Sequence, residues 1–389
     1  MRKYGRKTMA GEALRELMEL REDPYSRARA WKERTGGMAL GFFCCSAPEE
    51  FVHAAGALPV RITGENRGVT RSPAHLQSYC CSLARTGLDM ALDGSLSFLD
   101  GTVFLHTCDT MQRLSDIWRL NAGFVVHADV VLPVRFESES AWTYMTAELE
   151  AFKEKLEGLL GPIDDERIAG SIKTYNRNRE LLGRIYAMRR ADPSVLRYEE
   201  ALWLVTSSAL VEKSEHNKLL EAVVGDLEES GAAAAEGDAG AEEPVGLLGI
   251  GSVMDQWEFL EMVREAGATF VDDDFCNGHR YLETMTPEDL PPVEAVARRL
   301  WDRSACPCKH VPSRSRAGCI VNRAKESGAR GAVFFQFKFC EPHAFDYPHV
   351  KKALDDAGIP SLNLEFEQGS VSIGQMRTRV EALVETIRG

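Results

Sequence analysis

The sequence predicts an α/β fold with two Rossmann-like domains whose parallel sheets face a cleft, plus helical segments between the domains. Two segments, 102–109 and 332–341, each contain an apolar run that leads straight into a cysteine, Cys108 or Cys340. An apolar run that ends in a polar turn is typical of a parallel strand. A pattern of strand, turn, helix and strand occurs once in each half of the chain, and a helical pattern separates the two copies.

The first half of the chain begins with an amphipathic segment. Leu14, Leu17 and Leu20 are spaced for one face of a helix, which predicts helix over residues 8–35. Pro48 favours the first turn of a helix. The further elements predicted here are a strand over 38–43, a loop over 44–48, a helix from 49 that stops at Gly56, and a strand over 58–62.

The second half repeats this pattern. Residues 246–251 predict a strand and a glycine turn, a helix follows through Phe259 and Met262, and residues 268–271 predict the next strand. The segments AAGALPV (54–60) and EAGATFV (265–271) are nearly superimposable. We therefore interpret the chain as a duplicated α/β unit whose halves face each other across a cleft.

Four regions follow from these patterns. Leu149, Phe152 and Leu156 have helical spacing, and the stretch GDLEESGAAAAEGDAGAEEP is acidic and low in complexity, which predicts a solvated loop. The predicted regions are an N-terminal α/β domain (1–142), a helical connecting region (143–224), an acidic flexible loop (225–244) and a C-terminal α/β domain (245–389).

The composition excludes some functions. Of the 389 residues, 44% are hydrophobic and 27% charged, and no apolar run reaches membrane-spanning length. No apolar stretch follows the basic residues 1–7, so we expect no secretory signal and a cytoplasmic protein. The net charge of -13 argues against a nucleic-acid binder. In a reducing cytoplasm, ten cysteines indicate metal or redox chemistry rather than disulfides.

Cys108 and Cys340 are the strongest candidate ligands. A free cysteine is often a small buried hydrophobe, but polar residues follow both of these, as at the end of a strand beside a site. Cys80 and Cys81 precede another predicted helix, and a thiol at a helix N-terminus has a lowered pKa. One of these two is therefore a further candidate.

Five other cysteines could be ligands, neighbouring thiols or bystanders: Cys44, Cys45, Cys276, Cys306 and Cys308. Cys319 is expected in the core. The chain has no pair of CxxC motifs, which excludes zinc ribbons and ferredoxin-like runs. Widely separated thiols that converge only on folding suit an iron–sulfur cluster between domains. Three firm thiols would leave one iron of a four-iron cluster open to water, substrate or a neighbouring group.

Other groups could support such a cluster. His343 and Asp346 could deliver protons beside it, or could equally cap and pin a loop. Five arginines could bind phosphates of a nucleotide-like ligand: Arg61, Arg71, Arg85 and the pair Arg314 and Arg316. The chain has no P-loop, so we do not expect it to hydrolyse ATP itself.

Six stretches, spread over both domains, carry a resemblance. They are GFFCCSAPEEFVHAAGALPVRITG (41–64), YCCSLARTGLD (79–89), DGTVFLHTCDTMQRLSDIW (100–118), CPCKHVPSRSR (306–316), FKFCEPHAFDYPHVKKALDDAGIPSLNLEFE (337–367) and GQMRTRVEALVE (374–385). The chain resembles the 2-hydroxyacyl-CoA dehydratase / benzoyl-CoA reductase family. FCEPHAFDYP is most similar to the smaller cluster-binding subunit of ATP-dependent benzoyl-CoA reductases.

The resemblance implies that both α/β domains bind a 4Fe-4S cluster in the cleft, through Cys81, Cys108 and Cys340. It implies a homologous cluster-binding subunit in a hetero- or homodimer, an ATP-hydrolysing activator with its own 4Fe-4S cluster, and ferredoxin upstream. The implied reaction is anaerobic, single-electron radical chemistry. It reduces an aromatic, benzoyl-CoA-like or related acyl-CoA, or dehydrates a 2-hydroxyacyl-CoA.

A third branch of relatives implies a different cofactor. Double-cubane cluster proteins carry two four-iron cubes joined by sulfide and reduce small molecules instead of CoA thioesters. Cys44, Cys276 and Cys308 could supply the additional ligands, and a three-thiol site leaves them without a role. The leading hypothesis is an acyl-CoA reductase subunit. A homodimeric double-cubane (8Fe) reductase and a non-catalytic electron-transfer subunit are the alternatives.

Overall fold

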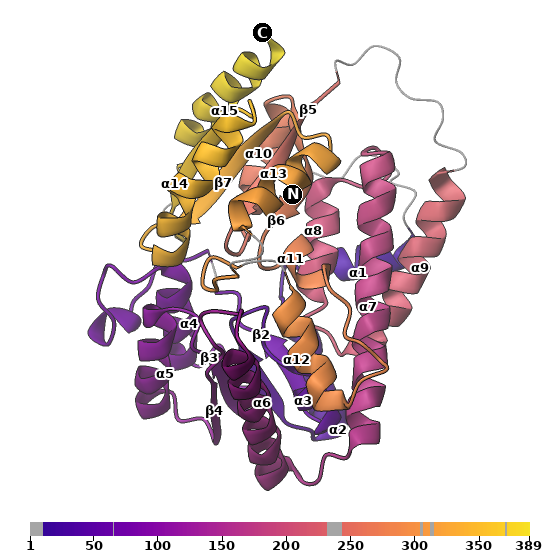
Figure 1. Cartoon of the computed structure of the whole chain (residues 1–389), viewed down its shortest axis with the longest axis vertical. Helices are drawn as coiled ribbons and strands as arrows, with labels where there is room; N and C mark the ends of the chain where they lie inside the picture. Colours follow the sequence, from indigo (N-terminus) through magenta and orange to yellow (C-terminus); the bar gives the residue numbers. More distant parts are fainter. Residues whose placement is uncertain (1–10, 65, 232–242, 304–305, 312–314, 370–371) are drawn as a thin grey trace.

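The computed structural model describes residues 11–64, 66–231, 243–303, 306–311, 315–369 and 372–389. These residues form two α/β lobes, one above the other in Figure 1, with long helices running alongside. Each lobe contains a four-stranded parallel sheet. The predicted fold class, with two Rossmann-like domains and helical segments between them, is therefore confirmed.

The sheet of the N-terminal lobe has the strand order β2-β1-β3-β4. Its strands are β1 (Ala39–Phe42), β2 (Leu58–Arg61), β3 (Gly101–Leu105) and β4 (Val126–Val130). Its helices are α1 (Glu12–Glu19), α2 (Ser26–Thr35), α3 (Glu49–Ala54), the 3-10 turn η1 (Ser72–Ala74), α4 (Ser82–Asp93) and α5 (Asp109–Asn121). The strands β1, β2 and β3 are buried along their whole length, as expected for a sheet with both faces covered.

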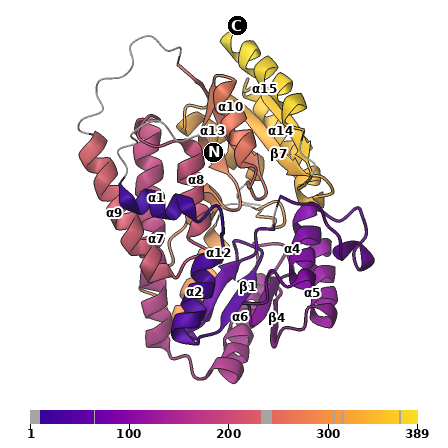
Figure 2. The same cartoon turned by 180° about the vertical axis from the view of Figure 1, so that it is seen from behind.

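The N-terminal helix predicted over 8–35 was wrong in one respect. Residues 8–10 lie outside the described residues, and the remainder forms two helices, α1 and α2, with a turn between them. Pro24 lies in that turn. Proline lacks a backbone N–H and its ring clashes with the preceding helical turn, so it kinks or breaks a helix, and Pro24 lies where the helical pattern breaks. α1 packs against α8 and α9, which Figure 2 shows from behind.

The sheet of the C-terminal lobe has the order β6-β5-β7-β8, the same order as the first sheet strand for strand. Its strands are β5 (Val245–Gly251), β6 (Ala268–Asp274), β7 (Gly331–Phe337) and β8 (Ser361–Phe366). The helices of this half of the chain are α10 (Trp257–Glu265), α11 (His279–Leu282), α12 (Pro292–Asp302), α13 (Arg316–Glu326), α14 (Glu341–Asp356) and α15 (Ile373–Arg388). AAGALPV leads into β2 and EAGATFV into β6, at equivalent edges. The matching topology agrees with a duplicated unit.

The strand predicted at 268–271 is longer than expected, because it continues through three buried aspartates to Asp274. Each carboxylate has a partner: Asp272 accepts a hydrogen bond from Arg190, Asp273 from Tyr186, and Asp274 from Arg280. Buried charges are tolerated when they are paired and hydrogen-bonded, and only the tertiary structure supplies these partners.

Four helices connect the sheets: α6 (Glu139–Leu160), α7 (Asp165–Ala191), α8 (Tyr198–Ser207) and α9 (Lys213–Gly231). The flexible loop predicted from residue 225 begins too early, because 225–231 continue α9. Val224 and Leu227 of this helix are buried, and Asp226 accepts a hydrogen bond from the backbone N–H of Gly11 at 2.8 Å. Residues 232–242 lie outside the described residues. The domain boundaries themselves stay a prediction.

One helix of the C-terminal half packs with the other lobe. Val296 and Leu300 of α12 share a hydrophobic cluster with Leu105 of β3 and Phe152 of α6. Trp301 stacks on Phe136 with ring centroids 5.2 Å apart. Figure 1 shows α12, in orange, among the purple elements of the N-terminal lobe. The segment that follows α12 is thereby held at the junction of the lobes.

A second set of contacts joins the lobes beside α4. Arg85 pairs with Glu367, and Thr86 Oγ1 donates to Gln368 Oε1 at 2.8 Å. The backbone N–H of Gly369 donates to Asn66 Oδ1 at 2.8 Å. We call these contacts the interlobe latch.

None of the helices in the described ranges combines the length and the apolar character needed to cross a bilayer.

Candidate metal centre

The carboxyl ends of the strands bring cysteines to the junction of the lobes. Cys44 follows β1 and Cys108 follows β3, its neighbour in the first sheet, while Cys276 follows β6 and Cys340 follows β7. The strand order reverses between β1 and β3 in the first sheet and between β5 and β7 in the second. Ligands bind beyond the strand ends at such a switch point. The two switch points therefore supply thiols to one region.

Three of the predicted ligands share the same local structure. Cys81, Cys108 and Cys340 are the N-cap residues of α4, α5 and α14. A helix N-terminus carries a positive partial charge and unpaired N–H groups, which stabilise an anionic thiolate or cluster. Phe339, just before Cys340, has φ of 63°, a left-handed conformation that is strained for a bulky residue. The turn into α14 is therefore held by its surroundings.

Burial keeps these three thiols protonated in the metal-free chain. It raises the pKa of Cys81 to about 12, and it also raises the pKa of Cys108 and of Cys340. The charge of Cys108 raises the pKa of Cys81, and the charges of Cys81 and Cys108 raise that of Cys340. The structure thus brings the three predicted ligands together from both lobes. Metal binding here would release protons, because the thiolate is the ligand.

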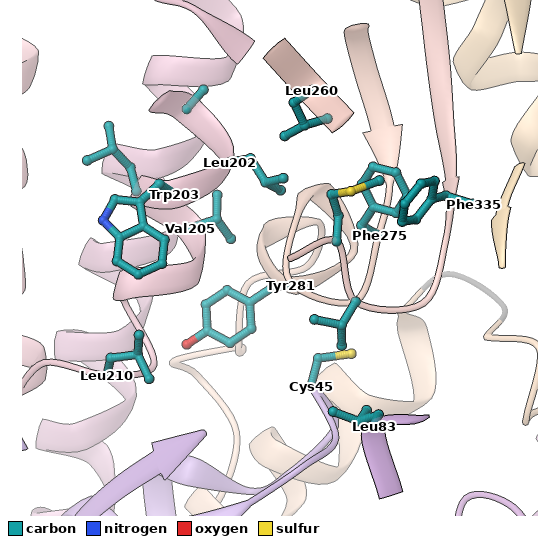
Figure 3. Packing of buried hydrophobic residues seen from close by; sticks show 14 of the residues in the cluster. Cys45, Leu83, Leu202, Trp203, Val205, Leu210, Leu260, Phe275, Tyr281 and Phe335 are labelled. Carbon is teal, nitrogen blue, oxygen red and sulfur yellow. The ribbon is translucent and has the colours of Figure 1, made fainter. Parts of the chain in front are cut away.

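The cysteines that the sequence left open form a second group. The Cys276 thiol hydrogen-bonds to Cys45, as does the Cys44 thiol, and together these contacts lower the pKa of Cys45 well below its ordinary value. The pKa values of Cys44 and Cys276 are raised by the same hydrogen bonds. Three thiols from loops in the two halves of the chain therefore lie near enough to shift one another's pKa values. Figure 3 shows Cys45 near Leu83 of α4 and Tyr281 of α11.

Cys306 and Cys308 join this group to the first. A hydrogen bond from Cys308 lowers the pKa of Cys306 to about 6. The charge of Cys306 raises the pKa of Cys44 and of Cys340, and the charge of Cys108 raises that of Cys308. We call the following eight of the ten cysteines the thiol assembly: Cys44, Cys45, Cys81, Cys108, Cys276, Cys306, Cys308 and Cys340.

The other two cysteines differ. The charge of Cys80 also raises the pKa of Cys81, but we leave Cys80 out of the assembly because its buried sulfur lies 4.0 Å from Gln77 Oε1. Cys319, expected in the core, is only half-buried on α13.

Two buried arginines, which the sequence did not single out, contact the sulfurs. Arg280 Nη1 donates to Cys276 Sγ at 3.0 Å, and Arg303 Nη2 donates to Cys45 Sγ at 3.2 Å. Both side chains are buried. Arg280 lies four residues after Cys276 and Arg303 three before Cys306. That proximity was the signal available in the sequence, but it does not reveal the contact between Arg303 and Cys45.

The donor set suits an iron–sulfur cluster better than a single ion. Within the described ranges, no three His, Cys, Asp or Glu side chains are arranged to hold one metal ion. The thiols of a cluster lie further apart than the ligands of one ion, because each binds a different iron. Soft thiolates select iron–sulfur clusters. In addition, Arg303 Nε and His343 Nε2 are buried without a hydrogen-bond partner among the described residues, so donors remain for a bound group.

The two predicted proton donors differ in position: His343 is buried beside Cys340, whereas Asp346 lines an open cleft. His343 Nδ1 is 3.3 Å from Cys340 Sγ. Burial, together with the charges of Arg280 and Arg316, lowers the pKa of His343 to about 3, so its imidazole is neutral near pH 7. Asp346 accepts a hydrogen bond from Arg316 Nε at 2.7 Å and lines an open cleft. Neither position tests a catalytic role, which stays a prediction.

The open cleft reaches the thiol assembly at Cys108. Its volume is about 380 Å³, and Thr107, Asp109, Glu341 and Phe345 are among its lining residues. A cavity of this size holds a small organic molecule. Among the described residues, this cleft is the route that we find from the surface to one of the predicted metal-binding cysteines.

The arginines considered as phosphate ligands that the structure describes have other partners. Arg61 is buried and donates to the carbonyl of Cys276 at 3.0 Å, and Arg71 donates to the carbonyl of Leu92 at 3.2 Å. Arg85 pairs with Glu367, and Arg316 pairs with Asp274 and Asp346. Arg314 lies outside the described residues. The charges of the described arginines are therefore used within the chain, and the sequence-based interpretation of them as phosphate ligands has no support in these contacts.

Comparisons with known proteins agree with this architecture. Residues 44–387 match the model of the family described as 2-hydroxyglutaryl-CoA dehydratase, D-component. The chain is 26% identical over 373 residues to the (R)-phenyllactyl-CoA dehydratase beta subunit of Clostridium sporogenes, covering 96% of this chain and 98% of that protein.

Two further relatives cover the chain equally well. A subunit of the benzoyl-CoA reductase of Thauera aromatica is 25% identical, covering 94% of this chain and 95% of the relative. The beta subunit of the (R)-2-hydroxyglutaryl-CoA dehydratase of Acidaminococcus fermentans is 26% identical, covering 96% and 98%. With most of its length matched, and with the predicted resemblance confirmed, the chain belongs to the 2-hydroxyglutaryl-CoA dehydratase D-component family, which includes dehydratase and benzoyl-CoA reductase subunits.

Proposed function

We propose that this chain is the iron–sulfur subunit of an ATP-dependent, low-potential reductase and that it binds a double-cubane cofactor. The observation that carries the proposal is the thiol assembly, in which eight cysteines from both halves of the chain lie near enough to shift one another's pKa values. A four-iron cube takes four ligands, so two cubes that share a bridging sulfide need roughly six thiolates. The assembly can supply that number, whereas a single cube would leave five thiols unused.

The protein's own groups would hold and insulate the cofactor. Thiolates from both switch points would bind iron, and the N-termini of α4, α5 and α14 would balance negative charge. Arg280 and Arg303 already donate hydrogen bonds to sulfur. Cys45 and Cys81 are buried, so the lobes exclude bulk water on that side. When bound, the cofactor would supply single electrons at low potential, and the cleft beside Cys108 would receive a small substrate.

The relatives favour a second candidate. Two are named as dehydratase beta subunits and one as a benzoyl-CoA reductase subunit. In this case Cys81, Cys108 and Cys340 would bind one 4Fe-4S cluster. The reaction would be single-electron reduction of a benzoyl-CoA-like or related acyl-CoA, or dehydration of a 2-hydroxyacyl-CoA. The five remaining thiols of the assembly would then have no ligand role.

Partners follow from the same reasoning. The relatives are named as subunits, so we propose a homologous cluster-binding subunit as partner, which for the double cubane would be a second copy of this chain. The chain has no P-loop, so a separate ATP-hydrolysing activator with its own 4Fe-4S cluster would deliver electrons from ferredoxin. We expect this system in an anaerobic cytoplasm.

Metal analysis of the anaerobically isolated protein tests both candidates. About eight irons per chain, with matching sulfide, support the double cubane, and about four support the single cluster. Absence of iron and sulfide would contradict both. Electron paramagnetic resonance of the reduced protein identifies the cluster type. Assays with small-molecule acceptors and with benzoyl-CoA, each with and without the activator, then decide the substrate class.

A further inference from the structure

Cationic side chains gather at one end of the thiol assembly. Arg280 and Arg303 donate to the sulfurs of Cys276 and Cys45 at 3.0 and 3.2 Å. Together with Cys306 and Lys309, the two arginines also line a cavity of about 20 Å³, which is separate from the open cleft. The three cations therefore border the same small space. We call this the arginine end.

At the arginine end, only Arg280 has a carboxylate as ion-pair partner among the described residues. Arg280 is paired with Asp274, which also accepts a hydrogen bond from Arg316. Among the described residues, no carboxylate lies within ion-pair distance of Arg303 or Lys309. Lys309 Nζ instead donates to the carbonyls of Leu132 and Pro133 at 3.0 and 2.9 Å.

Among the described residues, the hydrogen bonds of Arg303 go to carbonyl, hydroxyl and sulfur acceptors and not to a carboxylate. Its guanidinium donates to the carbonyls of Cys45 and Arg280, both at 2.7 Å, and to the Cys45 sulfur. Its buried Nε has no partner among the described residues. Electrostatic effects are strong in such a buried, low-dielectric place.

The opposite end, beside the open cleft, is acidic. Asp109 and Glu341 line the cleft together with Cys108. Burial is the main cause that raises the pKa of the Cys108 thiol, and the charges of these two carboxylates raise it further. Arg113 lies 3.9 Å from Asp109, but both side chains are mostly exposed, so solvent screens that pair. No cationic side chain in the described ranges donates a hydrogen bond to Cys108 Sγ. The two ends of the assembly thus differ in charge.

We propose that Arg280, Arg303 and Lys309 are positioning residues that make the arginine end the place where an added electron resides. Positive charge and hydrogen bonds to sulfur raise the reduction potential of a cluster. Asp109 and Glu341 act in the opposite sense near Cys108, but more weakly, because both are exposed and solvent screens their charges. With the cofactor bound, the three cationic residues would stabilise added negative charge at the buried end, away from the open cleft. This inference rests on the proposed iron–sulfur function.

The test is a redox titration of the anaerobic, cofactor-loaded protein, followed by electron paramagnetic resonance. Lys309→Met removes a charge, and Arg303→Lys keeps the charge but loses the fork of donors. We expect each to shift the one-electron equilibrium toward the oxidised state by about tenfold, which is 59 mV. Glu341→Gln is expected to shift it the other way, without changing the spectrum of the reduced state. Either variant at the arginine end should change that spectrum.

Arg299→Lys is the matched control. Arg299 is equally buried, but its side chain donates to the carbonyls of Thr284 and Tyr281, both at 3.0 Å, and not to sulfur. If the Lys309 and Arg303 variants bind iron like the wild type yet titrate like Arg299→Lys, the inference is overturned. Should Arg303→Lys not fold, Lys309→Met decides alone. Absence of iron from the wild type would instead remove the proposed function, so the two failures are distinguishable.

Discussion

The guanidinium of Arg303 donates a hydrogen bond to Cys45 Sγ at 3.2 Å, although the two residues lie 258 positions apart. Arg303 directly follows α12, the helix of the C-terminal half that packs into the N-terminal lobe. Burial of Val296 and Leu300 thereby places a cation against the first cysteine loop. The contact ties the chemistry of the thiol assembly to the packing that interleaves the lobes.

Cys81→Ser should lose bound iron, whereas Cys80→Ser should keep it. Cys81 is the N-cap of α4 and interacts with Cys108, while the sulfur of Cys80 lies 4.0 Å from Gln77. Iron and sulfide per chain, measured after anaerobic isolation, check this. Equal loss in both variants would show that the neighbouring thiols are interchangeable and that the choice of Cys81 is wrong.

Arg179→Met should destabilise the protein by about 3–5 kcal/mol, because it leaves a buried carboxylate without its cation. Arg179 Nη2 donates to Glu50 Oε1 at 2.6 Å, with both side chains at most 1% exposed. The control is Arg184→Met, which breaks a half-exposed pair with Glu228 and should cost about 0–1 kcal/mol. Urea unfolding of the two variants gives the comparison, and similar losses would contradict the assigned role.

The same pair predicts how stability depends on pH. Burial opposes ionisation of Glu50, but the charges of Arg179 and Arg299 outweigh it and lower its pKa from 4.5 to about 2. A lowered folded-state pKa gives stability that is fully present above pH 4.5 and is lost as the pH falls through about 2. The difference between the two pKa values corresponds to roughly 3 kcal/mol.

Glu50→Gln is the variant that isolates this effect. The gap in unfolding free energy between wild type and Glu50→Gln should be constant from pH 7 to about 5 and should shrink toward pH 2. Denaturant titrations at several pH values measure the gap. A gap that stays constant down to pH 2 would mean that Glu50 titrates normally in the folded state.

The interlobe latch should slow the loss of cofactor. Gln368 accepts a hydrogen bond from Thr86 and donates one to Asp255. Thr86 lies in the first turns of α4, whose N-cap is Cys81. Gln368→Ala removes these bonds, and one bond of about 1 kcal/mol corresponds to roughly a fivefold rate change. Iron release to an anaerobic chelator should accelerate accordingly. Gln375→Ala, at an exposed position on α15, should leave the rate unchanged.

Local patterns were sufficient for much of the fold. Apolar runs and glycine turns placed β3, β5 and β7 to within a residue or two, and they placed Cys108 and Cys340 at the strand ends. The sequence failed where a local preference was overridden. The acidic composition of residues 225–231 led to a predicted loop where α9 continues, and three consecutive aspartates led to a predicted strand that ended before β6 does. In both places, partners distant in sequence stabilise the observed structure.

The amino-acid sequence by itself determined the two parallel sheets and the placing of single thiols at their carboxyl ends, because strand periodicity and turn chemistry act over a few residues. Only the tertiary structure decided that Cys45, Cys276 and Cys306 join the same assembly and that Arg280 and Arg303 bond to sulfur there. The reason is physical. These contacts depend on how α12 and the two lobes pack, and packing joins residues whose spacing in the chain carries no signal.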